Sequence, residues 1–133
     1  MNPSEIGARA EFAVASALNR AGCLVFVPFF NGHGRVDLVY ENDAAVLRRV
    51  QCKTSHLTAG VISFWVCSNT GNQRKDYRAD ADEFGVYSPE LNLVYLVPVD
   101  DVPIRQARMR VDPPRNNQEH GIRWAEPYRL GPP

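Results

Sequence analysis

Four polar residues could together hydrolyse a phosphodiester bond: Glu11, Asp37, Gln51 and Lys53. Carboxylate and amide oxygens are hard ligands of the kind that Mg²⁺ takes, usually with one or two carboxylates from the protein. A bound divalent ion lowers the pKa of a water molecule and stabilises charge on a phosphoryl group. A nearby ammonium group neutralises developing charge. The residue types therefore point to metal-dependent phosphodiester chemistry.

Three of these residues belong to a predicted β-hairpin. The segments 36–41 and 45–53 flank the turn-prone pair Asn42-Asp43 and are predicted to be antiparallel strands. Gln51 and Lys53 are two residues apart, so their side chains project from the same face of the sheet. If the hairpin loop is odd in length, Asp37 pairs near Gln51 and lies on that face too.

Glu11 lies on a predicted N-terminal helix. Asn2 is a suitable N-cap, Pro3 fits the first helical position, and Glu5 completes a capping box. Apolar residues follow at helical spacing up to Ala21, and Gly22 is expected to end the helix. Glu11 falls on the edge of this apolar stripe, from which its carboxylate can point toward the packed sheet. Phe12 falls on the opposite, polar face.

In this order and at this spacing, the motifs resemble those of the PD-(D/E)xK nuclease superfamily. The resemblance rests on Gly7-Ala8-Arg9-Ala10-Glu11, Val36-Asp37-Leu38-Val39 and Val50-Gln51-Cys52-Lys53-Thr54, and it continues through segments 82–87, 94–98, 116–118 and 122–125. It is closest to the branch of group I intron-associated homing endonucleases and more distant from archaeal Holliday junction resolvases. It implies a restriction-endonuclease-like α/β core, in which an N-terminal helix packs on a mixed β-sheet whose central antiparallel hairpin carries the site.

The resemblance also implies roles for individual residues. Asp37 would be the main ligand of Mg²⁺, for which Mn²⁺ would substitute, with Gln51 and the backbone carbonyl of Cys52 beside it. Glu11 would bind the metal directly or through a water molecule, and Lys53 would act on the nucleophile. The implied reaction cuts double-stranded DNA to leave 5′-phosphate and 3′-hydroxyl ends.

The sequence departs from the family pattern at two positions. Val36 stands where the family name has proline, and Gln51 stands at the second acidic position. An amide oxygen brings no negative charge, so Gln51 predicts weaker metal binding than glutamate would give. The homing-endonuclease branch uses glutamine at this position.

Charge and composition limit how the chain could meet DNA. The formal net charge is zero, which argues against a general nucleic-acid coat, but the charges are segregated along the chain. The stretch from Asp76 to Asp101 is acidic, and arginines recur from Arg105 onward. A set of basic residues near the site motifs is predicted to contact the DNA backbone: His33, Arg35, His56, Arg74, Lys75 and Arg78.

The 133 residues predict one nuclease domain over 1–133, whose part from about residue 100 could be an oligomerisation or DNA-binding extension. No apolar run reaches the length of a membrane span, and the start lacks the order of a signal peptide, so we expect a cytoplasmic protein. One site per small domain and two strands to cut predict a homodimer or homotetramer. Trp65 and Trp124 are expected in the core or at a subunit contact.

Further strands and helices are predicted with less regular signals. Strands are expected at 24–30, 61–67, 84–87, 93–97 and 109–111, and short helices near 103–107 and 122–126.

Three alternative functions stay open at this point. A structure-specific nuclease of the Holliday junction resolvase type would act on branched DNA. A catalytically inactive DNA-binding module of the same fold would explain Gln51, and a scaffold that binds only a protein partner would show no salt-dependent DNA affinity. As for metals, Cys52 with His56 is half a zinc site at best. The acidic cluster Asp76, Asp80, Asp82 and Glu83 lacks the pattern of a calcium loop and is better interpreted as a solvated or structural patch.

Overall fold

The computed structural model describes residues 1–30, 35–66, 68–70, 73–75, 80–116 and 120–133, with backbone only for 68–70 and 73–75. The chain begins with helix α1 (Pro3–Arg20). Asn2 and Glu5 form the predicted capping box, with Asn2 Oδ1 2.9 Å from the Glu5 amide nitrogen. Gly22 follows the helix with a φ of +88°, a backbone conformation that glycine adopts without strain. The predicted helix is confirmed, including both of its ends.

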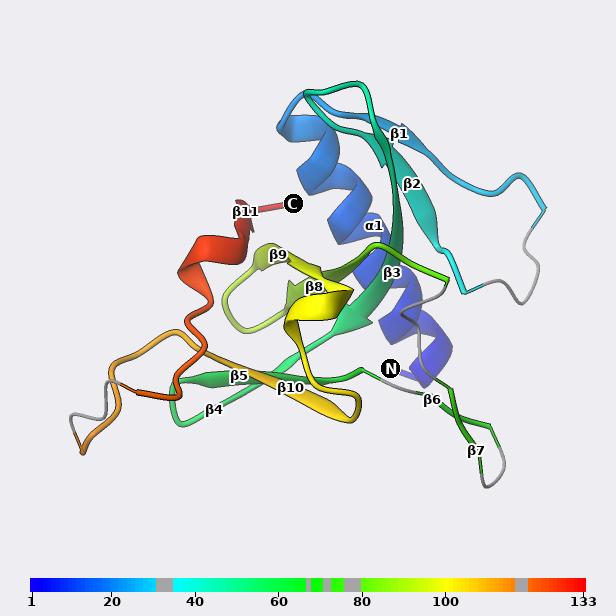
Figure 1. The fold of residues 1–133 in the computed structure, drawn as a ribbon. Helices are drawn as coiled ribbons and strands as arrows, with labels where there is room; N and C mark the ends of the chain where they lie inside the picture. Colours follow the sequence, from blue (N-terminus) through cyan, green and yellow to red (C-terminus); the bar gives the residue numbers. More distant parts are fainter. Residues whose placement is uncertain (31–34, 67, 71–72, 76–79, 117–119) are drawn as a thin grey trace.

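Most of the strands build one mixed sheet (Figure 1). Its order is β1-β2-β3-β8-β9-β11, in which β3 and β8 are parallel and the other neighbours antiparallel. The strands are β1 (Leu24–Phe26), β2 (Leu38–Glu41), β3 (Leu47–Thr54), β8 (Glu83–Ser88), β9 (Leu93–Pro98) and β11 (Arg129–Gly131). The predicted fold class, a helix packed on a mixed sheet with a central antiparallel hairpin, is confirmed.

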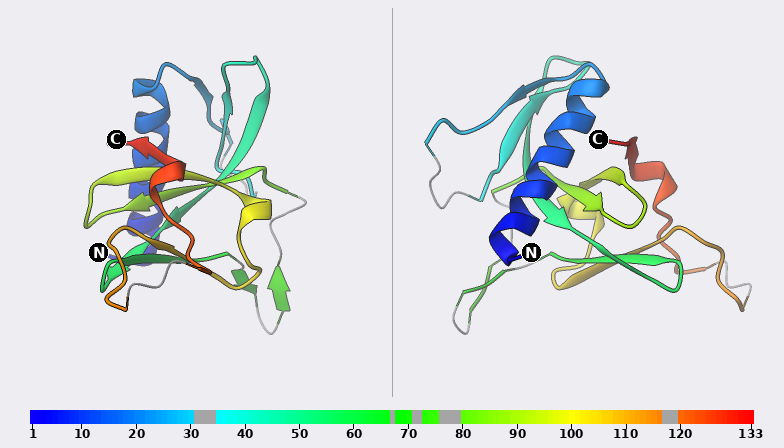
Figure 2. Two further views of the ribbon diagram at one scale, coloured as in Figure 1. Left: turned by 60° about the vertical axis from the view of Figure 1, so that its left-hand side comes forward. Right: turned by 180° about the vertical axis from the view of Figure 1, so that it is seen from behind.

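A smaller three-stranded sheet lies across from the main sheet on the side away from α1 (Figure 2). It has the order β10-β5-β4 and consists of β4 (His56–Thr58), β5 (Val61–Trp65) and β10 (Gln106–Arg110). A short hairpin, β6 (Ser68–Thr70) and β7 (Gln73–Lys75), follows β5. Two 3₁₀ turns, η1 (Val99–Asp101) and η2 (Glu126–Tyr128), complete the described elements.

The core has two parts, one on each side of the main sheet. Helix α1 covers one face through Val14, Leu18 and their neighbours, which pack on Leu38 and Val50. The three-stranded sheet covers the other face through Ile62, Phe64, Met109 and residues packed around Phe84. Gly85 lets α1 approach β8, because a Cβ atom there would lie 2.6 Å from Val14 Cγ1.

Several predicted elements differ from the structure. The strand expected at 24–30 ends at Phe26, and the exposed rings of Phe29 and Phe30 contact each other edge to face instead. The helix expected near 103–107 is wrong, because Gln106 and Ala107 begin β10 and alternate between exposed and buried positions. The helix expected at 122–126 is also wrong: the only helical turn there begins at Glu126, within the described residues.

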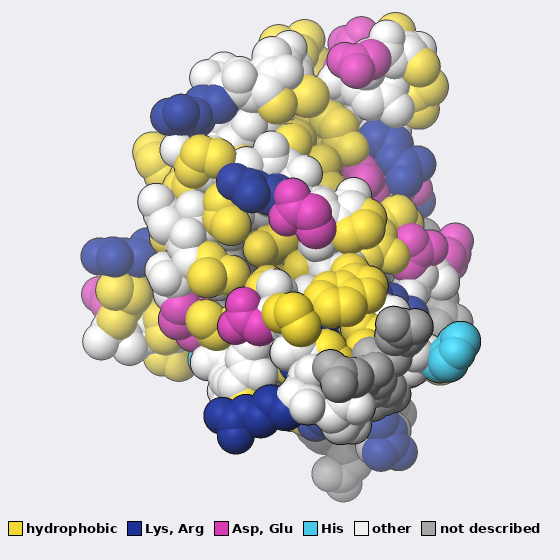
Figure 3. Space-filling view, turned by 90° about the vertical axis from the view of Figure 1, so that its left-hand side faces the viewer, with side chains coloured by type: hydrophobic (Ala, Val, Ile, Leu, Met, Phe, Trp, Pro, Cys, Tyr) yellow, Lys and Arg dark blue, Asp and Glu magenta, His cyan; other side chains and the backbone are white. Residues whose placement is uncertain are grey.

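The surface of the described residues is mixed in character. Figure 3 shows hydrophobic side chains gathered across the middle of the face on which β11 and η2 lie, with lysine and arginine side chains toward its edges. Trp65 and Trp124 are 61% and 40% exposed, so neither lies in the core of this chain, and a subunit contact at these residues stays a prediction. In the described part of the chain, no helix is long and apolar enough to span a membrane.

Candidate active site

Asp37 directly precedes β2 and is hydrogen-bonded to β3. The register opposes Leu38 to Val50, and the Asp37 amide also donates to the Val50 carbonyl at 2.9 Å, so the regular pairing ends at Leu38 and does not set Asp37 opposite Gln51. The loop between Glu41 and Leu47 has five residues, the odd length on which the predicted pairing depended. Asp37 Oδ2 accepts a hydrogen bond from the Cys52 amide at 2.7 Å, which fixes the orientation of the carboxylate.

Glu11 approaches Asp37 from helix α1. Partial burial raises the pKa of Glu11, and the charge of Asp37 and a hydrogen bond between the two carboxyl groups raise it further. Burial also raises the pKa of Asp37, although the Cys52 amide, Glu11 and the positive charge of Lys53 each act in the opposite direction. Two carboxyl groups in contact cannot both ionise without cost, so the pair favours holding a proton or binding a cation.

Gln51 and Lys53 lie on the face of β3 opposite the helix. In the parallel pairing with β8, Gln51 is opposite Phe84 and Lys53 opposite Val86. The Gln51 Oε1 atom is buried and has no hydrogen-bond partner among the described residues. The Lys53 ammonium lies 6.0 Å from the centroid of the Phe84 ring, and its charge acts on Asp37.

These donors suit a hard divalent cation. The N–H and C=O of one strand residue face the same neighbouring strand, so the Cys52 carbonyl points to the side on which Asp37 lies. Two carboxylates, a backbone carbonyl and an amide oxygen without a partner form an oxygen-only set, which fits Mg²⁺ or Mn²⁺ better than zinc. Within the described residues, no three His, Cys, Asp or Glu side chains form a metal cluster, so such an ion would depend on Gln51, the carbonyl and water.

The structure thus brings Glu11 and Asp37 into contact and places Lys53 close enough for its charge to act on Asp37, while Gln51 lies between Val50 and Cys52, the two residues to which Asp37 is hydrogen-bonded. The sequence did not reveal the Cys52 amide as the group that orients Asp37. Strand alternation is the sequence signal that could have indicated this hydrogen bond. The backbone groups of Val50 and Cys52 both face the side of β3 on which β2 lies. Because β2 begins opposite Val50, no residue of β2 lies opposite Cys52.

The residues predicted to contact DNA have different outcomes. Arg35 forms an ion pair with Asp80, which holds the segment just before Asp37. His56 is exposed at the start of β4. Arg74 and Lys75 lie in β7, but their side chains, like His33 and Arg78 as a whole, are outside the described residues.

The acidic cluster has a structural role in the described part of the chain. Asp82 binds Arg49 through two side-chain contacts of 3.1 and 3.2 Å and through the Arg49 amide at 2.8 Å. Glu83 accepts from the hydroxyl of Tyr40 and lies 3.4 Å from Arg48 Nε. With Asp80 bound to Arg35, these acids pair with arginines rather than with a calcium ion, while Asp76 lies outside the described residues. Cys23 and Cys52 are free thiols, and among the described residues no group of three His, Cys, Asp or Glu side chains contains both Cys52 and His56.

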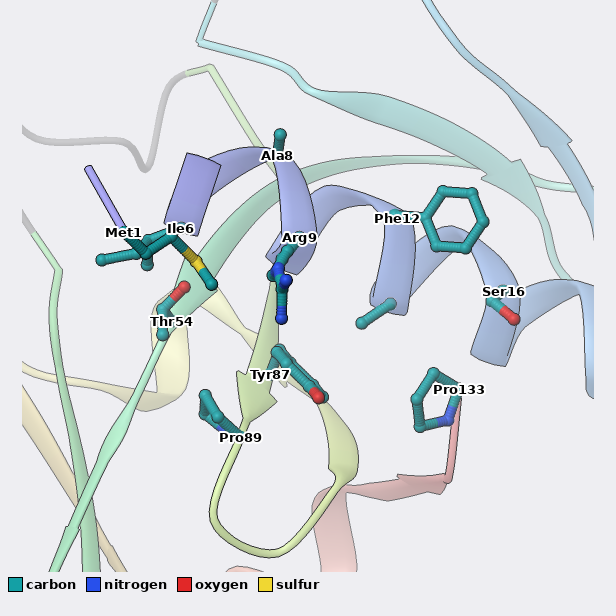
Figure 4. Close-up of a pocket in the computed structure, with 11 residues that line it drawn as sticks. Met1, Ile6, Ala8, Arg9, Phe12, Ser16, Thr54, Tyr87, Pro89 and Pro133 are labelled. Carbon is teal, nitrogen blue, oxygen red and sulfur yellow. The ribbon is translucent and has the colours of Figure 1, made fainter. Parts of the chain in front are cut away.

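A cavity of about 640 Å³ lies on another face of α1 and involves none of the four candidate residues. Figure 4 shows Arg9 extending from the helix toward Tyr87, with Phe12 and Pro133 farther along. Apolar side chains line most of it. It is therefore a feature separate from the polar site at Asp37.

A helix that packs on a mixed sheet with a central antiparallel hairpin places the chain in the restriction-endonuclease-like fold class. The family model described as PD-(D/E)XK endonuclease matches residues 1–131, and the chain belongs to this family. A solved bacterial homing endonuclease, I-Ssp6803I, has the same fold, with a TM-score of 0.76 and 22% identity over 97% of this chain and 89% of that one. No curated protein sequence matches the chain.

Proposed function

We propose that the chain is a Mg²⁺-dependent endonuclease that hydrolyses phosphodiester bonds of double-stranded DNA and leaves 5′-phosphate and 3′-hydroxyl ends. The observation that carries this proposal is the meeting of the Glu11 and Asp37 carboxyl groups beside Lys53 and the buried oxygen of Gln51. The fold shared with a homing endonuclease favours a linear duplex over branched DNA as the substrate.

In this proposal Asp37, Gln51 and the Cys52 carbonyl hold the metal, and Glu11 joins them directly or through a water molecule. A divalent ion held there would lower the pKa of a bound water molecule and stabilise charge on the phosphoryl group. The Cys52 amide keeps Asp37 in a single orientation. Lys53 holds its ammonium group on the Phe84 ring, from which it can orient the nucleophile and offset negative charge on the phosphate.

The test is a cleavage assay on plasmid DNA, linear duplex and a four-way junction in Mg²⁺. We expect Asp37→Ala and Lys53→Ala each to lower the rate at least about 100-fold while DNA binding persists. Asp43→Ala, in the exposed turn of the same hairpin, removes a carboxylate away from the site and should cleave like the natural protein. Intact binding without cleavage of any substrate would instead identify an inactive DNA-binding module.

Removing the metal separates this chemistry from metal-free mechanisms. Excess EDTA should stop cleavage, and added Mg²⁺ or Mn²⁺ should restore it. Cleavage that continues unchanged in EDTA would contradict the proposed site. The oligomeric state and the cytoplasmic location stay predictions.

A further inference from the structure

The three-stranded sheet has one face in the core and one face in solvent. The pairing of β4, β5 and β10 aligns Leu57 with Ile62 and Met109, and Phe64 with Ala107, all on the inner face. Strand alternation places the remaining residues on the outer face. They form three rows: Thr58–Val61–Arg110, His56–Ser63–Arg108 and Trp65–Gln106.

The outer face is polar and carries positive charge only. None of its eight residues is acidic, and two are arginines. Arg108 contacts Gln106 Oε1 at 3.5 Å, and Arg110 donates to the Asp112 backbone carbonyl at 3.3 Å. In the part of the chain that the structure describes, neither of them forms an ion pair with a carboxylate.

This separates Arg108 and Arg110 from the arginines around the main sheet. Arg35, Arg48 and Arg49 are each paired with an acid of the 80–83 segment. The acids of that segment therefore offset positive charge elsewhere. Although the formal net charge of the chain is zero, the outer face of the three-stranded sheet carries two arginines and no acidic residue among its eight members.

The outer face is joined to the candidate active site through a continuous stretch of chain. β3 ends at Thr54, buried Ser55 anchors its amide on the Tyr87 carbonyl at 2.9 Å, and β4 begins at His56. His56 is three residues after Lys53, and Arg108 follows His56 in the same row of the sheet, on the far side of Ser63.

We propose that the outer face of the three-stranded sheet binds the phosphate backbone of duplex DNA to one side of the cleaved bond, through Arg108 and Arg110. Arginine is well suited to this role because its guanidinium group stays charged and can bind a phosphate with two hydrogen bonds. The inference rests on the proposed endonuclease function and assigns it a binding surface outside the metal site.

The test measures the salt dependence of binding to a labelled 30-base-pair duplex in EDTA, where no cleavage is expected. Each phosphate contact contributes close to one unit to the slope of log affinity against log salt. We expect the double variant Arg108→Gln/Arg110→Gln to lower the magnitude of the slope by about two and to weaken binding about tenfold or more in moderate salt. An unchanged slope would overturn the proposal.

A matched control loses the same charge elsewhere. Arg20 lies in the last turn of α1, and Arg129 lies in β11 within 3.8 Å of Glu126. The double variant Arg20→Gln/Arg129→Gln should keep the natural slope. An equal loss of slope in both double variants would overturn the proposal, because it would show general attraction to net charge rather than a binding face.

A second measurement needs no loss of charge. The chain has two tryptophans, so Trp124→Phe leaves Trp65 as the single indole, on the outer face beside Gln106. We expect duplex DNA to change the Trp65 emission and added salt to reverse the change. Emission that does not respond while anisotropy reports binding would place the DNA elsewhere and overturn the proposal.

The cleavage assay keeps this inference distinct from the proposed function. If the arginine-dependent slope is found but the natural protein cuts nothing in Mg²⁺, the binding face stands and the endonuclease function fails. If the natural protein cuts DNA and the slope does not depend on Arg108 and Arg110, only the binding face fails.

Discussion

Gln51 can offer an oxygen ligand but no negative charge. The carboxyl groups of Glu11 and Asp37 are in contact, and the pKa of each is raised. The Oε1 atom of Gln51 is buried without a hydrogen-bond partner among the described residues, so it is desolvated whether or not a cation is present. A neutral ligand limits the repulsion in the metal-free protein, and it also limits the attraction for the metal. A substitution at this position that raises the affinity for the metal should therefore lower the stability of the metal-free protein.

The substitution Gln51→Glu tests this trade-off. A third carboxylate beside Glu11 and Asp37 should raise the affinity for Mg²⁺ about tenfold, a change of about 1.4 kcal/mol. The same change should lower the melting temperature in EDTA because of like-charge repulsion. Calorimetric titration of Mg²⁺ and thermal melting in EDTA measure the two effects. Asn19→Asp, an equal charge change at the exposed end of α1, should alter neither.

The Asp37 carboxyl predicts a second effect, on stability against pH. Its pKa is raised chiefly by burial, so the folded protein holds this proton more tightly than the unfolded chain does. That contribution to stability is complete below the unfolded-state pKa and is lost as the pH rises through the folded-state pKa. Metal-free Asp37→Asn, which cannot ionise, should therefore melt at a higher temperature than the natural protein at pH 7.

The stability difference should shrink as the pH falls below the ordinary carboxyl range. Thermal melting of both proteins in EDTA from pH 3 to pH 7 measures it, with Asp43→Asn in the exposed hairpin turn as the control. A variant that melts below the natural protein at pH 7 would show that the hydrogen bond from the Cys52 amide outweighs the cost of burial.

At the scale of elements, the contact of α1 with the main sheet determines where Glu11 lies. That contact depends on Gly85, because a Cβ atom there would lie 2.6 Å from Val14 Cγ1 and 3.0 Å from Val50 Cγ1. Val14 is three residues beyond Glu11, almost one helical turn along α1. Any movement of the helix away from Gly85 therefore also moves the carboxylate away from Asp37.

We expect Gly85→Ala to destabilise the protein by about 1–3 kcal/mol through overpacking and to lower cleavage as well. Gly7→Ala, in α1, is the control, since a Cβ atom there meets no heavy atom within 4 Å. It should stabilise the protein by up to about 1 kcal/mol, because alanine favours the helix. Urea unfolding measures both changes. Equal effects of the two substitutions would refute this account of the helix–sheet contact.

Local chemistry explains which elements were predictable. The capping residues and apolar spacing of α1 act within a few turns, so both ends of the helix could be found from sequence. The hairpin was predictable for the same reason, because alternation and the turn at Asn42 lie within 20 residues. The candidate site draws on these two elements together, since Glu11 borders the helical stripe and Asp37 is hydrogen-bonded to Val50 and Cys52 of the hairpin.

Tertiary pairing explains what the sequence did not show. Segment 106–110 alternates in burial only because β5 lies beside it, and Pro103 before it suggested a helix start. β4 has three residues and exists as a separate strand only because Ser55 turns the chain from one sheet to the other. The partner of Arg35 was equally hidden, because Asp80 is 45 residues away and no local pattern joins them.

At the scale of the whole molecule, one candidate site must meet two DNA strands. The four candidate residues occur once in the chain, so a double-strand cut requires either two visits or two copies. Figure 3 shows hydrophobic side chains gathered on one face. Burial of this apolar surface between two copies of the chain would favour their association. The similarity to the solved homing endonuclease was found between single chains, so the oligomeric state of this protein stays a prediction.

We expect the protein to sediment as a dimer or tetramer of the 14.9 kDa chain. Two sites held in one particle cut both strands in one encounter, so supercoiled plasmid should become linear without a long-lived nicked form. Analytical ultracentrifugation and a plasmid time course, run at the same protein concentrations, measure the two properties together. Dilution below the dissociation constant of the oligomer should convert the product from linear to nicked circles. A monomer at all concentrations that nonetheless linearises plasmid directly would contradict the coupling of assembly to double-strand cleavage, because one site would then cut both strands.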